Sequence, residues 1–126
     1  MGKKILIVDD SPSIRGQVRF TLSRAGYEIV EAEDGQDALA KIRAHADAVM
    51  VLCDVNMPRM NGLEMLEALA RGPGRAPPVV MLTTEGGAAL VQRAKSAGAK
   101  GWIVKPFAPD LLLAAVKKVA GDAKAA

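Results

Sequence analysis

Five short apolar runs recur along the chain, and a longer segment of mixed polarity follows each of them. The runs are rich in Val and Ile and are bounded by Gly, Pro, Asp or Lys, which is typical of β-strands. They are apolar throughout rather than alternating, so both faces of each strand are expected to be buried. We predict strands at Ile5 to Val8, Tyr27 to Val30, Ala48 to Cys53, Pro78 to Leu82 and Gly101 to Val104.

The segments after the runs are predicted to be amphipathic helices. Their apolar residues recur at helical spacing, as at Ile14, Val18 and Leu22. Ser11 stands before Pro12 as an N-cap stands before a first-turn proline. Strand and helix therefore alternate five times, which predicts an α/β fold with a parallel sheet covered on both faces. At this size we expect a flavodoxin-like (βα)5 doubly wound sandwich with strand order 2-1-3-4-5.

The length of 126 residues fits one compact domain. We expect this domain to span residues 1–121, with residues 122–126 as a short frayed tail and no separate output domain. Any signal would then have to leave through the surface of the domain itself.

Charge and composition disfavour several classes of partner. The net charge of +3 is small and is scattered rather than gathered into a basic run, which argues against nucleic-acid binding. No apolar stretch approaches a membrane span or a signal peptide. Cys53 is the single cysteine and cannot form an internal disulfide, so it is expected to be a buried thiol in a cytoplasmic protein.

Polar residues with complementary chemistry stand at the ends of the predicted strands. In an open parallel sheet, ligands bind beyond the carboxyl ends of the strands. Three of the residues expected at this edge are carboxylates, which would repel one another. A hard divalent cation such as Mg²⁺ or Mn²⁺ relieves that repulsion. A carboxylate beside such a cation and an ammonium group can attack phosphorus to form an aspartyl phosphate. The residues concerned are Asp9, Asp10, Asp54, Thr83 and Lys105.

Taken singly, each of these residues has an ordinary structural explanation. Asp9 or Asp10 after a strand is a common helix cap, Thr83 would satisfy a local backbone group, and Lys105 would be a solvated lysine. Their joint placement at the strand ends favours the chemical interpretation.

Four sequence blocks follow one another along the chain at characteristic spacing. They are Ile5-Leu-Ile-Val-Asp-Asp-Ser11, Asp54-Val-Asn-Met-Pro58 with Asn61-Gly62, Met81-Leu-Thr-Thr84, and Gly101-Trp-Ile-Val-Lys-Pro-Phe107. Together they resemble the receiver domains of CheY-like response regulators, and the resemblance extends over essentially the whole chain.

The resemblance implies a role for each residue of the site. Asp54 would accept the phosphoryl group, and Asp10, Asp54 and the backbone carbonyl of Asn56 would ligate Mg²⁺. Asp9 would act mainly through bound water. Thr83 would hydrogen-bond the phosphoryl oxygen. Lys105 would pair with the phosphate, and its peptide bond to Pro106 would be cis.

The resemblance also implies a conformational switch and a way of tuning its lifetime. Thr83 and the aromatic residue of the fifth strand, here Trp102, would form the switch. Trp departs from the commoner Tyr and Phe at this position, and a surface Trp without a switch role is the alternative. Asn56 and Glu85 flank the site and would give a short-lived phosphorylated state.

The function implied is that of a single-domain response regulator in chemotaxis or motility. A histidine kinase of the CheA type would phosphorylate it, and a downstream protein would bind the phosphorylated monomer. The target would meet the face of the fourth helix, fifth strand and fifth helix, which carries Arg93, Lys95, Lys100, Lys117 and Lys118.

Two alternatives remain open at the level of sequence. The first is a receiver in a phosphorelay or a developmental pathway, because it would use the same site. The second is a phosphatase with Asp54 as nucleophile, which is disfavoured because no second acid–base group is visible. The chain is otherwise expected to be no enzyme beyond its own phosphorylation and dephosphorylation.

Overall fold

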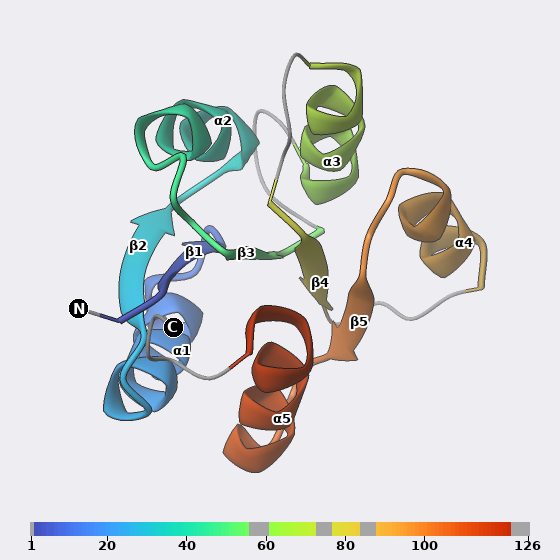
Figure 1. The fold of residues 1–126 in the computed structure, drawn as a ribbon. Coiled ribbons are helices and arrows are strands. Elements are labelled where there is room, and N and C mark those ends of the chain that lie inside the picture. The colour runs from blue at the N-terminus through green and yellow to red at the C-terminus, as the bar shows by residue number, and fades with distance from the viewer. Residues whose placement is uncertain (1, 56–60, 73–76, 84–87, 122–126) are drawn as a thin grey trace.

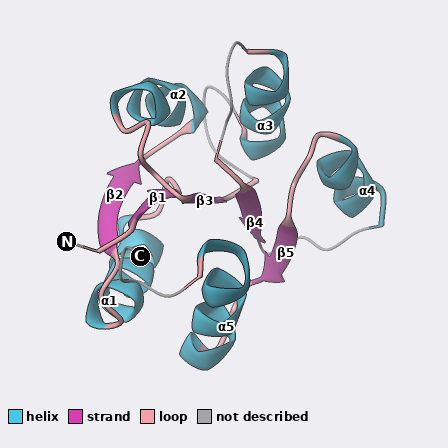
Figure 2. Ribbon diagram, viewed as in Figure 1, coloured by secondary structure: helices cyan, strands magenta, loops and turns pink. Residues whose placement is uncertain are grey.

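The computed structural model describes residues 2–55, 61–72, 77–83 and 88–121, and its sheet has the predicted topology. Five parallel strands lie in the order β2-β1-β3-β4-β5. The strands are β1 (Lys4–Val8), β2 (Glu28–Ala32), β3 (Met50–Cys53), β4 (Val79–Thr83) and β5 (Gly101–Val104). The helices are α1 (Pro12–Arg24), α2 (Gly35–Ala44), α3 (Gly62–Arg71), α4 (Ala88–Ser96) and α5 (Pro109–Ala120). Figure 2 shows the alternation of strands and helices.

The helices cover both faces of the sheet. Figure 1 shows α1 and α5 on one face and α2, α3 and α4 on the other. Successive residues of β1 supply the two faces in turn, as the pleat of a strand requires. Ile5 and Ile7 pack into the core beneath α1 and α5, whereas Leu6 and Val8 pack into the core on the opposite side. From Ile5 to Val8 the strand is apolar and buried on both faces, so the prediction from its composition is confirmed.

The first helix begins as the sequence predicts. The Ser11 side chain accepts a hydrogen bond from the Ile14 backbone N–H, and Pro12 is the first helical residue. The cap satisfies one of the backbone donors that the first turn leaves without a partner inside the helix. This turn directs the chain away from the end of β1, where Asp9 and Asp10 stand.

The second strand lies later in the sequence than its apolar run suggests. Tyr27 is buried in the core but precedes the strand, which runs from Glu28 to Ala32. β2 is an edge strand, and its residues are mostly half-buried, so apolar composition does not mark where it begins and ends. Its bounds follow instead from its pairing with β1, which runs from Lys4↔Glu28 to Val8↔Ala32. The central strands β3 and β4 begin two residues and one residue later than predicted, and β4 ends one residue later, whereas the other edge strand, β5, has the predicted bounds. The apolar runs therefore locate each strand to within about two residues.

The expected tail at residues 122–126 lies outside the described residues. Within the described ranges, no helix combines the length and the hydropathy needed to cross a bilayer.

Candidate functional site

The carboxyl ends of four strands bring the predicted polar residues to one edge of the sheet. Asp9 directly follows β1, Asp54 follows β3, Thr83 ends β4 and Lys105 follows β5. The register pairs Val8 with Cys53, so Asp9 and Asp54 leave adjacent strands at the same level. Across the sheet Thr83 is paired with Val104, which places Lys105 one step beyond.

Three carboxylates meet at this edge, and we call Asp9, Asp10 and Asp54 the acidic cluster. One carboxylate oxygen from each lies within 4.8 Å of the others. Asp9 and Asp54 are buried, at 1% and 7% exposure, whereas Asp10 is exposed. Carboxylate oxygens this close together, with one open side, are the donor set that a hard cation such as Mg²⁺ prefers. The residues present therefore fit a divalent cation.

The ammonium group of Lys105 reaches the acidic cluster from the end of β5, which β4 separates from β3 in the sheet. Its Nζ atom donates to Asp9 Oδ2 at 2.7 Å and lies 3.5 Å from Asp54 Oδ2. The lysine side chain is only 11% exposed, so this is not the solvated surface lysine of the structural alternative. One positive charge facing two buried carboxylates offsets part of their repulsion and leaves net negative charge for a cation.

The backbone of Asp54 is held on both sides. Its N–H donates to the Val8 carbonyl at 2.9 Å. On the other side α3 begins against it: a Cβ atom added to Gly62 would lie 2.1 Å from the Asp54 carbonyl oxygen. The Gly62 N–H also donates to the Val55 carbonyl at 2.9 Å. Only glycine allows this approach, which fixes the position of Asp54 at the end of β3.

Cys53 is a buried thiol, as predicted, and is not part of the metal site. Burial, followed by the nearby charge of Asp54, raises the pKa of the thiol far above its usual range, so the sulfur stays protonated. It donates to the Asp54 carbonyl at 3.3 Å and contacts Met65 Sδ at 3.8 Å.

Thr83 and Trp102 occupy neighbouring strands. Thr83 is fully buried at the end of β4. Trp102 on β5 is half-buried; it packs against the core beneath α4 and lines a cavity of about 600 Å³ between β5 and α5. Trp102 is therefore partly buried, and its role in a switch stays a prediction.

Part of the predicted site lies outside the described residues. Asn56, whose carbonyl the resemblance assigns to the metal, and the flanking Glu85 both belong to that part. The peptide bond between Lys105 and Pro106 is cis, so that prediction is confirmed.

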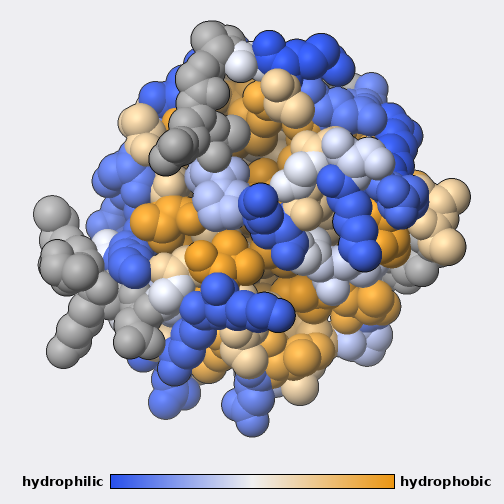
Figure 3. Space-filling view, turned by 45° about the vertical axis from the view of Figure 1, so that its right-hand side comes forward, coloured by the Kyte–Doolittle hydropathy of each residue, from blue (hydrophilic) through white to orange (hydrophobic). Residues whose placement is uncertain are grey.

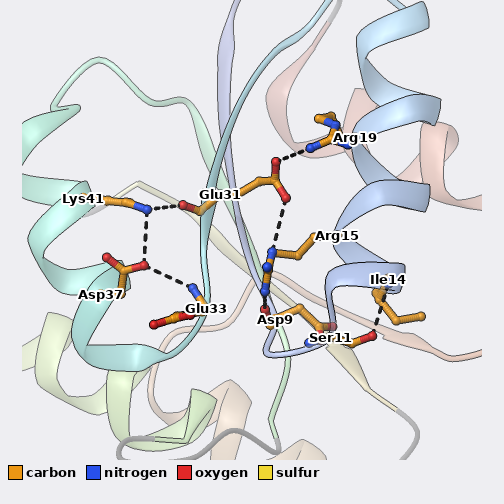
Figure 4. A network of polar contacts seen from close by, with 9 residues as sticks. All are labelled: Asp9, Ser11, Ile14, Arg15, Arg19, Glu31, Glu33, Asp37 and Lys41. Atoms are coloured by element: carbon orange, nitrogen blue, oxygen red, sulfur yellow. Dashed lines mark hydrogen bonds and ion pairs between the residues drawn. The ribbon is translucent and has the colours of Figure 1, made fainter.

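Sequence reasoning missed two residues next to the acidic cluster. Arg15 of α1 donates to the backbone carbonyl of Asp9 and to the side chain of Glu31 on β2 (Figure 4). A contact between a side chain and a backbone carbonyl leaves no pattern of residue types, so the sequence offers no signal for it.

The fold and this site define a class of protein. The sequence profile of the response regulator receiver domain matches residues 5–117, and the chain belongs to this family.

Its relatives include chemotaxis proteins of similar length. The chain is 44% identical over 120 residues to chemotaxis protein CheY1 of Helicobacter pylori, covering 94% of this chain and 97% of the relative. The solved structure of chemotaxis protein CheY4 of Vibrio cholerae matches with a TM-score of 0.87 and 44% identity, over 94% of this chain and 99% of that one. A CheX–CheY–BeF3–Mg²⁺ complex from Borrelia burgdorferi matches with a TM-score of 0.87 and 31% identity, over 93% and 88%.

Proposed function

We propose that this protein is a chemotaxis-type response regulator that a histidine kinase phosphorylates on Asp54. The observation that carries the proposal is the contact of Lys105 with two carboxylates of the acidic cluster, at 2.7 and 3.5 Å. A buried acid beside two other acids and a lysine does little to stabilise the fold. Such clusters of buried charge are typical of sites where a reaction takes place and where its charges are neutralised.

In this proposal, one Asp54 carboxylate oxygen attacks phosphorus of the donor. A new O–P bond forms, and the bond between phosphorus and the leaving group of the donor breaks, so that Asp54 becomes an acyl phosphate. Lys105 lies close enough to Asp54 to neutralise a phosphoryl oxygen there. In doing so it would give up its hydrogen bond to Asp9. Asp10, Asp54 and the carbonyl of Asn56 would hold Mg²⁺. Bound there, the ion would neutralise charge that develops on the phosphoryl oxygens.

Thr83 and Trp102 are proposed to transmit the change. Phosphorylation adds negative charge and strong acceptor oxygens beside β4, and the hydroxyl of Thr83 stands at that strand end. Movement of Thr83 would alter the space beneath α4, which the Trp102 ring borders from β5. Trp102 also lines the cavity between β5 and α5, so a different rotamer of its ring would alter that part of the surface as well.

The proposed target surface is formed by α4, β5 and α5. Figure 3 turns the side with α4 and β5 forward and shows apolar surface between hydrophilic side chains. Arg93 is already paired with Glu67 through two hydrogen bonds at 2.9 and 3.1 Å. The other four basic residues are exposed and make no ion pair within the described parts of the chain: Lys95, Lys100, Lys117 and Lys118. Such a face suits a target segment that combines acidic and apolar residues.

The first experiment incubates the purified protein with Mg²⁺ and a small phosphodonor and measures its mass. We expect a gain of one phosphoryl group, lost in Asp54→Asn and retained in Asp47→Asn, an equivalent change at an exposed aspartate. No gain in the wild-type protein would refute the proposal. Turnover of phosphomonoesters by the wild type would instead support the phosphatase alternative.

The pathway needs a second experiment. Phosphotransfer from each histidine kinase of the host should be fastest from a chemotaxis kinase, and beryllofluoride should increase binding of a motility protein. Preferred transfer from a relay phosphotransfer protein would favour the relay alternative. The roles proposed for Asn56 and Glu85 predict a short phosphorylated lifetime, and a half-life of hours would contradict them.

A further inference from the structure

The polar groups of Asp9 are held on every side. Its N–H donates to the Ala32 carbonyl at 3.1 Å, and its own carbonyl accepts from Arg15 Nη1 at 2.5 Å. Its carboxylate accepts from the Ser11 N–H at 2.9 Å and from Lys105 at 2.7 Å. The residue therefore has a fixed orientation relative to β1, β2 and α1.

The fixed orientation of Asp9 also restricts the backbone of Asp10. The Asp9 carbonyl and the Asp10 N–H belong to one planar peptide unit, so a bond that fixes the carbonyl also fixes the start of Asp10. Asp10 itself is exposed and forms no hydrogen bond or ion pair within the described ranges. Of the hydrogen bonds to Asp9 given above, the one from Arg15 to the Asp9 carbonyl is made directly to the Asp9–Asp10 peptide unit.

Arg15 is in turn held by β2. Its Nε atom donates to Glu31 Oε1 at 3.2 Å, and the two side chains are 18% and 27% exposed. Glu31 Oε2 pairs with Arg19 on the solvent side at 2.6 Å, and Lys41 of α2 donates to the Glu31 carbonyl. Figure 4 shows the guanidinium of Arg15 between Asp9 and Glu31. The planar guanidinium makes both bonds at once, and the single ammonium of a lysine does not match that geometry.

We propose that Arg15, supported by Glu31, is a positioning residue for the metal site. It orients the Asp9–Asp10 peptide so that the Asp10 carboxylate faces Asp54 before the cation arrives. The inference rests on the proposed function, because the ion it serves is the Mg²⁺ of the acidic cluster. Metal affinity depends on such outer contacts, since a ligand held in place loses less freedom on binding.

A purely electrostatic role for Arg15 predicts the opposite sign. A positive charge near three carboxylates repels a cation, so removing it would strengthen Mg²⁺ binding, and a lysine would preserve the wild-type affinity. Positioning predicts weaker binding for both Arg15→Lys and Arg15→Met. The two roles are therefore separable by one measurement.

The test is calorimetric titration of the full chain with Mg²⁺, in the absence of a phosphodonor. We expect Arg15→Lys and Arg15→Met to weaken binding about 10- to 100-fold. Glu31→Gln retains the Arg15 side chain but removes the charge that holds it, so it should also weaken Mg²⁺ binding, by a smaller factor than the Arg15 substitutions. Arg19→Lys, which alters the other ion pair of Glu31 without touching Asp9, should leave the affinity unchanged. Thermal melts without Mg²⁺ check that each variant is folded.

The phosphorylation rate gives a second readout. In Arg15→Lys the Mg²⁺ concentration at half-maximal rate should rise, while the rate at saturating Mg²⁺ is retained. Unchanged or tighter Mg²⁺ binding in both Arg15 variants would overturn the inference, as would a lower maximal rate with an unchanged half-saturating concentration. If the wild type binds Mg²⁺ and is phosphorylated while the variants match it, this inference alone fails. If the wild type binds no Mg²⁺, the proposed function fails with it.

Discussion

The two ends of the sheet each carry a lysine–aspartate pair, and the pairs differ mainly in burial. At the amino end Lys4 lies 3.1 Å from Asp47, whose side chain is 72% exposed. At the carboxyl end Lys105 lies 2.7 Å from Asp9, whose side chain is 1% exposed. The exposed pair is screened by solvent and contributes little to stability. The buried pair keeps charge out of water beside a second buried acid, Asp54, which costs free energy unless another group completes the site.

The amino end is instead stabilised by contacts that close the C-terminus of α5. The Tyr27 hydroxyl donates to the Gly121 carbonyl at 2.6 Å, and Lys3 Nζ donates to the Ala120 carbonyl at 2.9 Å. These carbonyls come at the end of the helix, where no further turn supplies a donor. Polar contacts at the amino end thus satisfy the backbone, whereas those at the carboxyl end arrange charged side chains. The comparison predicts that changes at the carboxyl end alter metal binding and phosphorylation, and that changes at the amino end alter stability alone.

The largest effect is expected from Gly62→Ala at the carboxyl end. The added Cβ atom would lie 2.1 Å from the Asp54 carbonyl oxygen, a backbone atom that cannot move without displacing the end of β3. We expect a loss of about 3 kcal/mol in the free energy of unfolding, together with slower phosphorylation. Urea denaturation and the mass assay measure the two effects.

Gly16→Ala is the matched control, because Gly16 also lies in a helix and a Cβ atom there would meet nothing within 4 Å. It should stabilise the protein by about 0.5–1 kcal/mol through helix propensity. Similar effects of the two substitutions would show that the close approach at Asp54 is not what requires glycine.

The second effect concerns the response to Mg²⁺. In the wild type, Mg²⁺ at a hundred times its dissociation constant should raise the free energy of unfolding by about 2.7 kcal/mol. Asp10→Asn should abolish most of this rise, while without Mg²⁺ it should be no less stable than the wild type, because one of three mutually repelling charges is gone. Thermal melts with Mg²⁺ and with EDTA measure both quantities. A full Mg²⁺ response in Asp10→Asn would remove this residue from the site.

Sequence reasoning predicted the carboxyl end better than the amino end. Asp54, Thr83 and Lys105 stand directly at the ends of short apolar runs, and a parallel sheet must bring such ends to one edge. The contacts of the amino end depend instead on where α5 stops and on which way Tyr27 points, and neither has a periodic signature.

The contact from Arg15 to Asp9 shows the same limit within the site itself. The same sequence would be equally compatible with an Arg15 side chain that points from α1 into solvent. Only the crossing of α1 over the ends of β1 and β2 brings the guanidinium to a backbone carbonyl and to Glu31. Pattern therefore predicts which residues reach the site, and packing decides which residues hold them.

The third effect is expected from Tyr27→Phe at the amino end. Loss of the hydroxyl removes the hydrogen bond to the Gly121 carbonyl and keeps the buried ring. We expect a loss of about 1 kcal/mol in the free energy of unfolding. The Mg²⁺ affinity and the phosphorylation rate should stay at wild-type values, and a change in either one would break the separation between the two ends.

The smallest effect is expected from Asp47→Asn in the exposed pair. The hydrogen bond from Lys4 holds the pKa of Asp47 below its ordinary value, so the folded protein binds its proton at a lower pH than the unfolded chain. Its contribution is therefore present above the ordinary pKa of about 4 and disappears as the pH falls through the lower value of the folded state. Because the group is largely exposed, Asp47→Asn should have the same melting temperature at neutral pH as the wild type, within error. Its loss of stability below about pH 4 should be slightly less steep. A clear loss of stability at neutral pH would show that exposed pairs at the amino end contribute as buried ones do, and the contrast drawn from burial would then be wrong.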